Sequence, residues 1–279
     1  MQPLIINLAP TGLLPTRQQT PHVPLTAEEI ATDCVRCGAL GATMFHLHAR
    51  NADGSPSTDR AMFGNLVATV RQRIPDAVIV TTTSGRRAPE VAQRASSLML
   101  EGEQKPDMAS LTLGSLNFST EASINPPDTV IQLATLMHER GIRPELEVFD
   151  LGMVNVALTL IDKGLLEPPF YFNILLGNVA SAQATLLHLG TLVASLPPQS
   201  IWCAGGIGRY QKVANALGIA VGDGVRIGLE DNLWLDDMRT TLATNAQLTE
   251  RIAAQAKLLG RPLATPGEVR QRLGLSSFS

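Results

Sequence analysis

The sequence contains few cysteines, no long apolar run and no excess of positive charge. Its three cysteines, Cys34, Cys37 and Cys203, are too few and odd in number for a disulfide scaffold, which agrees with a reducing compartment. Every apolar run is shorter than the roughly 20 residues that span a bilayer, and the N-terminus lacks the positive region of a signal peptide. We therefore expect a cytoplasmic protein with no membrane segment.

Charge and composition exclude two further classes of protein. Twenty-two Lys and Arg against 25 Asp and Glu give a net charge of −3, without the basic excess of a nucleic-acid binder. Hydrophobic residues make up 44% of the chain and charged residues 17%, so the chain can build a large core and is not a disordered polymer. Its 279 residues are close to the size of about 250 that is typical of a (β/α)8 barrel, which predicts one domain over 1–279.

Short apolar runs alternate with helix-like segments along nearly the whole chain, a pattern typical of βα units. An open doubly wound sheet could be built from such units, but eight of them without a marked linker favour a closed (β/α)8 TIM barrel of the α/β class. Residues 245–275 are predicted to add two C-terminal helices. The predicted strands are 4–8, 43–48, 77–82, 108–111, 145–149, 171–175, 201–204 and 225–229.

Two histidines at the end of the second predicted strand are the sharpest chemical signal. His46 and His48 are two residues apart, so on a strand their side chains point to the same face. Barrels place catalytic side chains at the carboxyl ends of their strands, and neutral imidazole is a standard zinc ligand. For an isolated pair, histidines that only hydrogen-bond within the barrel are an equally good explanation. A catalytic zinc site needs a third protein ligand.

The end of the last predicted strand offers that ligand and a candidate base. Arg226, Gly228 and Glu230 alternate onto one face, which makes Glu230 the natural third ligand. Asp231 is predicted to be held by Arg226, which would keep it ionised and oriented for proton abstraction. The alternative is an Arg–carboxylate pair that only closes the barrel or caps the next helix.

Polar residues also mark the third, fourth and fifth predicted strands. Thr82, Thr83 and Ser110 could hold a carboxylate or carbonyl oxygen of a substrate, although ordinary turn formation explains them nearly as well. Glu145 and Glu147 alternate onto one face, so one of them is expected to face the barrel interior. A buried acidic side chain usually has a functional role or a partner of opposite charge.

A glycine-rich segment follows the seventh predicted strand. Gly206, Gly208 and Arg209 precede a helix, so this segment could approach a cofactor phosphate through backbone amides. It does not match the dinucleotide-binding fingerprint. Cys34 and Cys37 have no second pair to complete a tetrahedral metal site and are interpreted as buried helix residues.

Five groups of residues together resemble the β-keto acid cleavage enzymes, the family of 3-keto-5-aminohexanoate cleavage enzyme. The resemblance implies a (β/α)8 barrel that assembles as a homotetramer and binds one zinc ion per chain. It further implies that a β-keto acid reacts with acetyl-CoA to give acetoacetate and a new acyl-CoA. The match runs from residue 4 to residue 275, through 46–50, 106–118, 144–150, 206–209 and 226–232.

Motif matches carry the family's roles over to residues of this chain. A metal that chelates the keto oxygen would acidify the C2 hydrogen of the substrate and stabilise the enolate that attacks acetyl-CoA. Two imidazoles and a carboxylate also suit nickel, cobalt or iron. The implied site has the zinc ligands His46, His48 and Glu230, the base Asp231 with Arg226, the catalytic Glu147, and substrate contacts at Thr82 and Ser110.

Departures from the family pattern concern specificity. Leu14 stands where the enzyme for the aminated substrate carries an acid, so we expect Leu14 to face a neutral or apolar substrate tail. Thr112 stands where the family commonly has Asn, and residues 178–181 replace a VPGG-like turn. Two other functions stay open: a metal-dependent barrel lyase or hydrolase that does not use CoA, and a catalytically silent metabolite-binding barrel.

Overall fold

A computed structural model describes residues 1–276 and contains a closed barrel of eight parallel strands, as predicted. Residues 277–279 of the predicted domain lie outside the described residues. The strands are β1 (Ile5–Leu8), β2 (Met44–Leu47), β3 (Val78–Thr81), β4 (Met108–Thr112), β7 (Arg143–Val148), β8 (Phe170–Leu176), β9 (Ser200–Gly206) and β10 (Gly224–Ile227). β1 closes the ring by pairing with β10, where Ile5 lies beside Gly224. The antiparallel strands β5 (Leu116–Asn117) and β6 (Ala122–Ser123) form a hairpin in the loop after β4.

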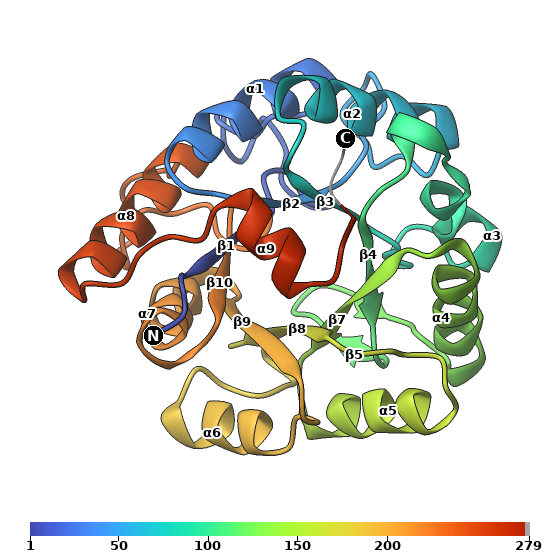
Figure 1. Cartoon of the computed structure of the whole chain (residues 1–279). Coiled ribbons are helices and arrows are strands. Elements are labelled where there is room, and N and C mark those ends of the chain that lie inside the picture. The colour runs from blue at the N-terminus through green and yellow to red at the C-terminus, as the bar shows by residue number, and fades with distance from the viewer. Residues whose placement is uncertain (277–279) are drawn as a thin grey trace.

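Helices surround this ring of strands (Figure 1). Local signals fix their ends: Thr26 and Glu29 form a capping box at the first helix, and Gly141 ends the fourth in a left-handed conformation. The helices are α1 (Ala27–Ala39), α2 (Arg60–Arg73), α3 (Val91–Arg94), α4 (Pro127–Arg140), α5 (Leu151–Asp162), α6 (Leu186–Ala194), α7 (Gln211–Val221), α8 (Asn245–Leu258) and α9 (Pro266–Arg272), with 3₁₀ turns at Ser96–Met99, Gly102–Gln104 and Gly208–Tyr210. No helix within 1–276 is long and apolar enough to cross a membrane.

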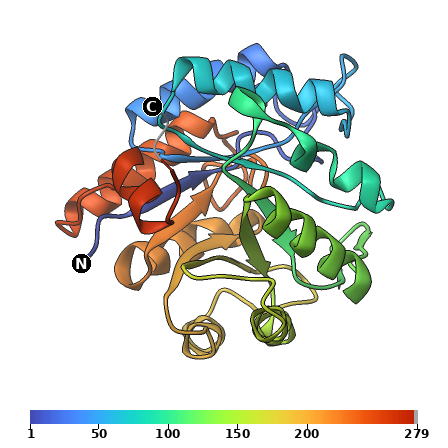
Figure 2. The ribbon, with the colours of Figure 1, turned by 45° about the vertical axis from the view of Figure 1, so that its right-hand side comes forward.

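The last helix closes one end of the barrel. Figures 1 and 2 show α9 lying across the end at which the strands begin. Val269 of α9 and Leu273, which follows the helix, pack against interior side chains of the strands, such as Ile5 and Met44. This end is therefore filled with apolar side chains, and the functional site lies at the opposite end, where the strands finish.

The predicted end of the last strand was wrong. β10 stops at Ile227 rather than at Leu229, because Gly228 takes φ 134° and turns the chain. Glu230 therefore does not share a strand face with Arg226 by alternation. It lies in the turn that follows the strand, and this turn brings its side chain to the histidines.

Gly228 is required by a close approach between two strand ends. A Cβ built on Gly228 would lie 2.1 Å from the carbonyl oxygen of Ala9. The backbone amide of Glu230 also donates to this carbonyl, at 3.2 Å. The contact between the end of β1 and the turn after β10 thus fixes the backbone of Glu230.

We expect Gly228→Ala to lower the free energy of unfolding by about 2–5 kcal/mol, because it combines an unfavourable φ with a backbone clash. Gly190→Ala is the matched control: Gly190 is exposed in α6 and an added Cβ meets nothing within 4 Å. This control should gain about 0.5–1 kcal/mol. Urea unfolding measures both, and equal stability of the two variants would contradict the prediction.

Candidate metal and catalytic site

A pocket of about 340 Å³ lies at the carboxyl ends of the strands and contains both histidines of the second strand. Its polar part includes five residues that the sequence had singled out, His46, His48, Thr82, Glu147 and Glu230, and its apolar part is formed by side chains that follow β4 and β7. The lining residues are His46, His48, Thr82, Ser84, Arg86, Thr112, Leu116, Phe118, Ser123, Glu147, Phe149 and Glu230.

Three ligand groups converge in this pocket as a metal site requires. The Nε2 atoms of His46 and His48 are 3.2 Å apart, and His48 Nε2 is 3.2 Å from Glu230 Oε1. The second oxygen of Glu230, Oε2, is buried and has no hydrogen-bond partner among the described residues. An orphaned buried carboxylate oxygen beside two imidazole nitrogens fits a divalent cation, and two His with one Glu is a known catalytic zinc set.

The two imidazoles are held in different ways. Glu145 Oε2 lies 2.5 Å from His46 Nδ1, and since a carboxylate only accepts, Nδ1 donates and Nε2 faces the pocket. Burial is the largest effect on the pKa of His46 and lowers it, but the carboxylates of Glu145 and Glu230 together raise it overall. Burial lowers the pKa of His48 to about 4, so its ring is neutral near pH 7, the form that binds metal.

Arg226 is the cation at the centre of the site, and its side chain is almost completely buried. Its Nη2 lies 3.0 Å from Glu230 Oε1, its Nη1 3.2 Å from Glu147 Oε1, and its Nε donates to Asp231 Oδ2 at 3.0 Å. The predicted pair of Arg226 and Asp231 is therefore present. The guanidinium also fixes Glu147 and Glu230 relative to that pair.

Carboxylates outnumber guanidinium groups in direct contact within this cluster. Four buried carboxylates, those of Glu145, Glu147, Glu230 and Asp231, surround the single guanidinium of Arg226. Buried like charges are costly unless they are paired or coordinate a metal. A divalent ion at the histidines and Glu230 would add positive charge beside these carboxylates.

The carboxyl group of Asp231 lies beside Arg226 in this cluster. Burial raises the pKa of its carboxyl group, and the opposing effect of Arg226 does not cancel the rise. A raised pKa brings a carboxylate closer to the range in which general bases work. The backbone carbonyl of Asp231 accepts from the Gly208 amide at 2.7 Å, which ties the base to the glycine-rich segment after β9.

The predicted substrate contacts divide into two groups. Thr82 lines the pocket. Thr83 and Ser110 bond to each other instead: Thr83 Oγ1 donates to the Ser110 carbonyl at 2.6 Å, and Ser110 Oγ accepts from the Thr83 amide at 3.1 Å. Leu14 is 38% exposed and is not among the lining residues.

Several polar residues of the site were missed by the sequence reasoning. Asn7, within the apolar run of β1, donates to Glu145 Oε1 at 2.7 Å and to the Tyr171 hydroxyl at 3.1 Å. Arg50 is buried and donates from Nε to the Gly12 carbonyl at 2.9 Å, beside Glu230. A single Asn between Ile6 and Leu8 was the available signal for Asn7. Nothing in the local pattern marked Arg86.

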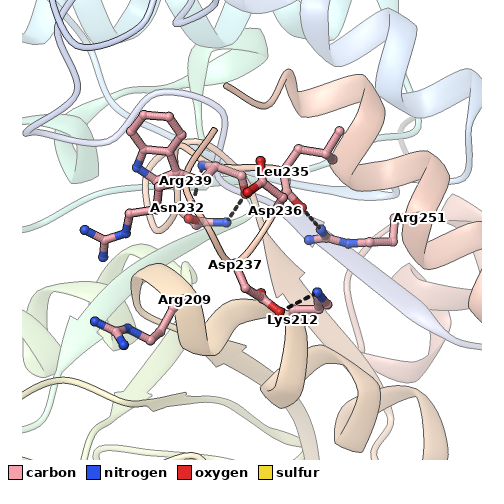
Figure 3. A pocket seen from close by; sticks show the side chains of 9 residues that line it. Arg209, Lys212, Asn232, Leu235, Asp236, Asp237, Arg239 and Arg251 are labelled. Carbon is pink, nitrogen blue, oxygen red and sulfur yellow. Dashed lines mark hydrogen bonds and ion pairs between the residues drawn. The ribbon is translucent and has the colours of Figure 1, made fainter. Parts of the chain in front are cut away.

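A second pocket of about 250 Å³ begins at Asn232, next to Asp231 in the chain (Figure 3). Arg209 and Arg239 line it and make no ion pair within 1–276, whereas Lys212 Nζ is 2.8 Å from Asp237 Oδ2. The Gly208 amide is already bonded to Asp231. Of the glycine-rich segment, the Arg209 side chain is thus the group best placed to meet an anion.

Comparison with known families matches residues 3–275 to beta-keto acid cleavage enzyme. The chain belongs to this family. It is 37% identical over 277 residues to the 3-keto-5-aminohexanoate cleavage enzyme of Fusobacterium nucleatum subsp. nucleatum, with 99% of both chains covered. It is 36% identical over 281 residues to the 3-oxoadipate:acetyl-CoA acetyltransferase of Cupriavidus necator, with 99% of this chain and 96% of the relative covered.

A solved structure adds support for the fold. The apo structure of ObcA aligns with a TM-score of 0.79 at 21% identity, over 91% of this chain and 66% of that chain. This chain therefore spans just under two thirds of ObcA, and the likeness concerns the fold alone. The predicted family is confirmed, and this β-keto acid cleavage enzyme family member is an enzyme that acts on β-keto acids.

We expect the purified protein to retain one divalent metal per chain and His48→Ala to lose it, because the site loses one of three ligands. Glu145→Gln should weaken metal binding about 10- to 100-fold through the orientation of His46. Elemental analysis and titration with a competing chelator measure both. His188→Ala, an exposed histidine outside the pocket, is the control. A His48→Ala protein with a full equivalent of metal would rule out the site.

Proposed function

We propose that the protein is a zinc-dependent enzyme that condenses a β-keto acid with acetyl-CoA and releases acetoacetate and a new acyl-CoA. The convergence of His46, His48 and Glu230 beside the pair of Arg226 and Asp231 carries this proposal. The name of the relative from C. necator, an acetyl-CoA acetyltransferase, supports acetyl-CoA as the second substrate.

Proton removal from C2 of the substrate is the first step that the site supports. A zinc ion held by His46, His48 and Glu230 would act as a Lewis acid that polarises the keto oxygen and acidifies C2. Arg226 holds Oδ2 of Asp231, and the other oxygen, Oδ1, is the proposed proton acceptor. Burial raises the pKa of Asp231, which makes its carboxylate a stronger base.

Bond making and bond breaking then follow in order. The C2 carbanion attacks the thioester carbonyl of acetyl-CoA, a carbon–carbon bond forms, and the CoA thiolate leaves. The thiolate attacks the original keto carbon, the bond from that carbon to C2 breaks, and Asp231 returns its proton to acetoacetate. Glu147, which accepts from Thr112 Oγ1 at 2.6 Å, is proposed to orient the substrate beside the metal.

Substrate contacts follow from the lining of the pocket. The Thr82 hydroxyl is proposed to hold an oxygen of the substrate, while Thr83 and Ser110 position the loop that carries Thr82. Leu14 does not line this pocket, so the neutral or apolar tail expected from it stays a prediction. The homotetramer and the cytoplasmic location stay predictions.

The test measures acetoacetate release from a panel of β-keto acids, with and without acetyl-CoA, before and after chelation. Release is expected only when both acetyl-CoA and metal are present, because the carbanion needs the thioester as its acceptor. Release in the absence of acetyl-CoA would identify a lyase or hydrolase instead. No release from any member would reject the proposed reaction.

Asp231→Asn is the matched variant for this assay. It keeps the shape of the side chain and removes the proton acceptor, so kcat should fall about 100- to 10,000-fold. Metal content should stay at one equivalent, because Asp231 is not a proposed ligand. A variant that releases acetoacetate at the rate of the unmodified protein would exclude Asp231 as the base.

Acetyl-CoA is proposed to place its phosphates at the second pocket, where the guanidinium groups of Arg209 and Arg239 make no ion pair with any residue of 1–276 (Figure 3). Arg209→Gln should raise KM for acetyl-CoA several-fold and leave kcat unchanged, because this contact acts equally on the ground state and the transition state. Steady-state kinetics at two salt concentrations measure it. Lys212→Gln, whose amine is paired with Asp237, is the control. Equal effects of the two variants would contradict a role specific to Arg209.

A further inference from the structure

Arg86 is a largely buried cation that lines the substrate pocket and makes no hydrogen bond to the described residues. Its side chain is 12% exposed, and no acceptor within residues 1–276 lies in hydrogen-bonding range of the guanidinium. A guanidinium has five N–H donors in a planar fork that matches a carboxylate. Arg86 lines the pocket, so donors that bond to no acceptor of the described residues are available to an anionic ligand there.

The neighbouring acid does not satisfy this cation. Glu121 Oε1 is 4.0 Å from Arg86 Nη1, beyond hydrogen-bonding distance, and this oxygen is itself buried without a partner. Glu121 Oε2 also faces Arg87 Nε, at 3.6 Å. One carboxylate thus stands beside two arginines, and the local charge is positive.

The pocket between the metal ligands and Arg86 has an apolar wall. The Arg86 guanidinium lies over the ring of Phe118, with Cζ 4.4 Å from the ring centroid. Phe118 contacts Phe149 edge to face at 5.7 Å, and Leu116 completes this side. Cation–π contact orients the guanidinium, and the rings offer a surface for methylene groups.

The loop that carries Arg86 is held in place by a buried arginine. Arg94, 3% exposed, donates from Nε to the Thr83 carbonyl at 2.8 Å and from Nη2 to Asn125 Oδ1 at 2.7 Å. Asn125 in turn donates to the Gly114 carbonyl, next to the hairpin that carries Phe118. Arg86 and Phe118 are therefore fixed relative to each other before a substrate binds, which lowers the entropic cost of binding.

We propose that the substrate is a β-keto acid with a second carboxylate at the far end of its tail, and that Arg86 binds that carboxylate. In this arrangement the metal ligands would hold the β-keto acid group of the substrate. The aromatic and aliphatic side chains would contact its methylene groups, and the guanidinium would bind its distal carboxylate. This substrate class rests on the proposed function. It replaces the neutral or apolar tail that Leu14 alone suggested.

The kinetic test compares two β-keto acids of equal length, one ending in a carboxylate and one in the corresponding amide. The carboxylate should be preferred in kcat/KM by the unmodified protein, and Arg86→Gln should lose about 10- to 100-fold on that substrate alone. Arg86→Lys should recover part of the loss. Arg87→Gln is the matched control, because Arg87 is on the same loop, faces the same Glu121 and is 57% exposed.

Three kinetic outcomes would overturn the proposal. They are an equal loss on both substrates, a preference of the unmodified protein for the amide, and a rise of KM for acetyl-CoA alone in Arg86→Gln. The last outcome would assign Arg86 to a CoA phosphate. Metal content and melting temperature establish that each variant is folded.

A binding experiment separates this proposal from the reaction. Calorimetry with adipate and with hexanoate, which cannot be cleaved, needs no turnover. Adipate should bind the metal-loaded protein at least about tenfold more tightly than hexanoate, and Arg86→Gln should abolish the difference. Equal affinities would reject the distal carboxylate even if acetoacetate is released. An adipate preference without acetoacetate release would reject the reaction alone.

Discussion

The contact of the Arg226 guanidinium with three carboxylates is the interaction on which the site depends. One fully buried cation reaches Glu147 on β7, Glu230 and Asp231 beyond β10, so it connects strands that are distant in sequence. Removing one partner from such a buried cluster leaves uncompensated charge, which is strongly destabilising. The same guanidinium both holds the base and keeps a proposed metal ligand in place. Structural and chemical demands therefore fall on one side chain.

The polar site and the apolar packing that stabilises the fold lie at opposite ends of the barrel. At the end where the strands begin, α9 and the interior side chains form an apolar cluster. Arg270 and Arg272 pair there with Asp107 and Asp223, away from the pocket. The polar cluster at the other end can thus carry excess negative charge because the packing that stabilises the fold lies elsewhere.

The sequence was sufficient to predict the barrel and most of the site. The eight strands follow from apolar runs of regular spacing, and His46 and His48 from their two-residue period. Glu230 does lie beside the histidines, but the argument for it was partly wrong, because the strand ends before Gly228 and a turn, not alternation, brings the carboxylate there. Asn7 and Arg86 depend on contacts between distant segments. No local periodicity encodes such contacts, so only the folded chain reveals them.

The barrel cannot close until the ribosome has synthesised its last strand. β1 pairs with β2, but its other edge waits for β10, about 220 residues later. At about 5–20 residues per second, a ribosome needs on the order of 10–40 s to make that segment. The helix α9, which covers the interior side chains of the strands, emerges later still. The nascent chain therefore carries an open sheet edge and an uncovered apolar end through most of its translation, the period in which a chaperone has most to protect.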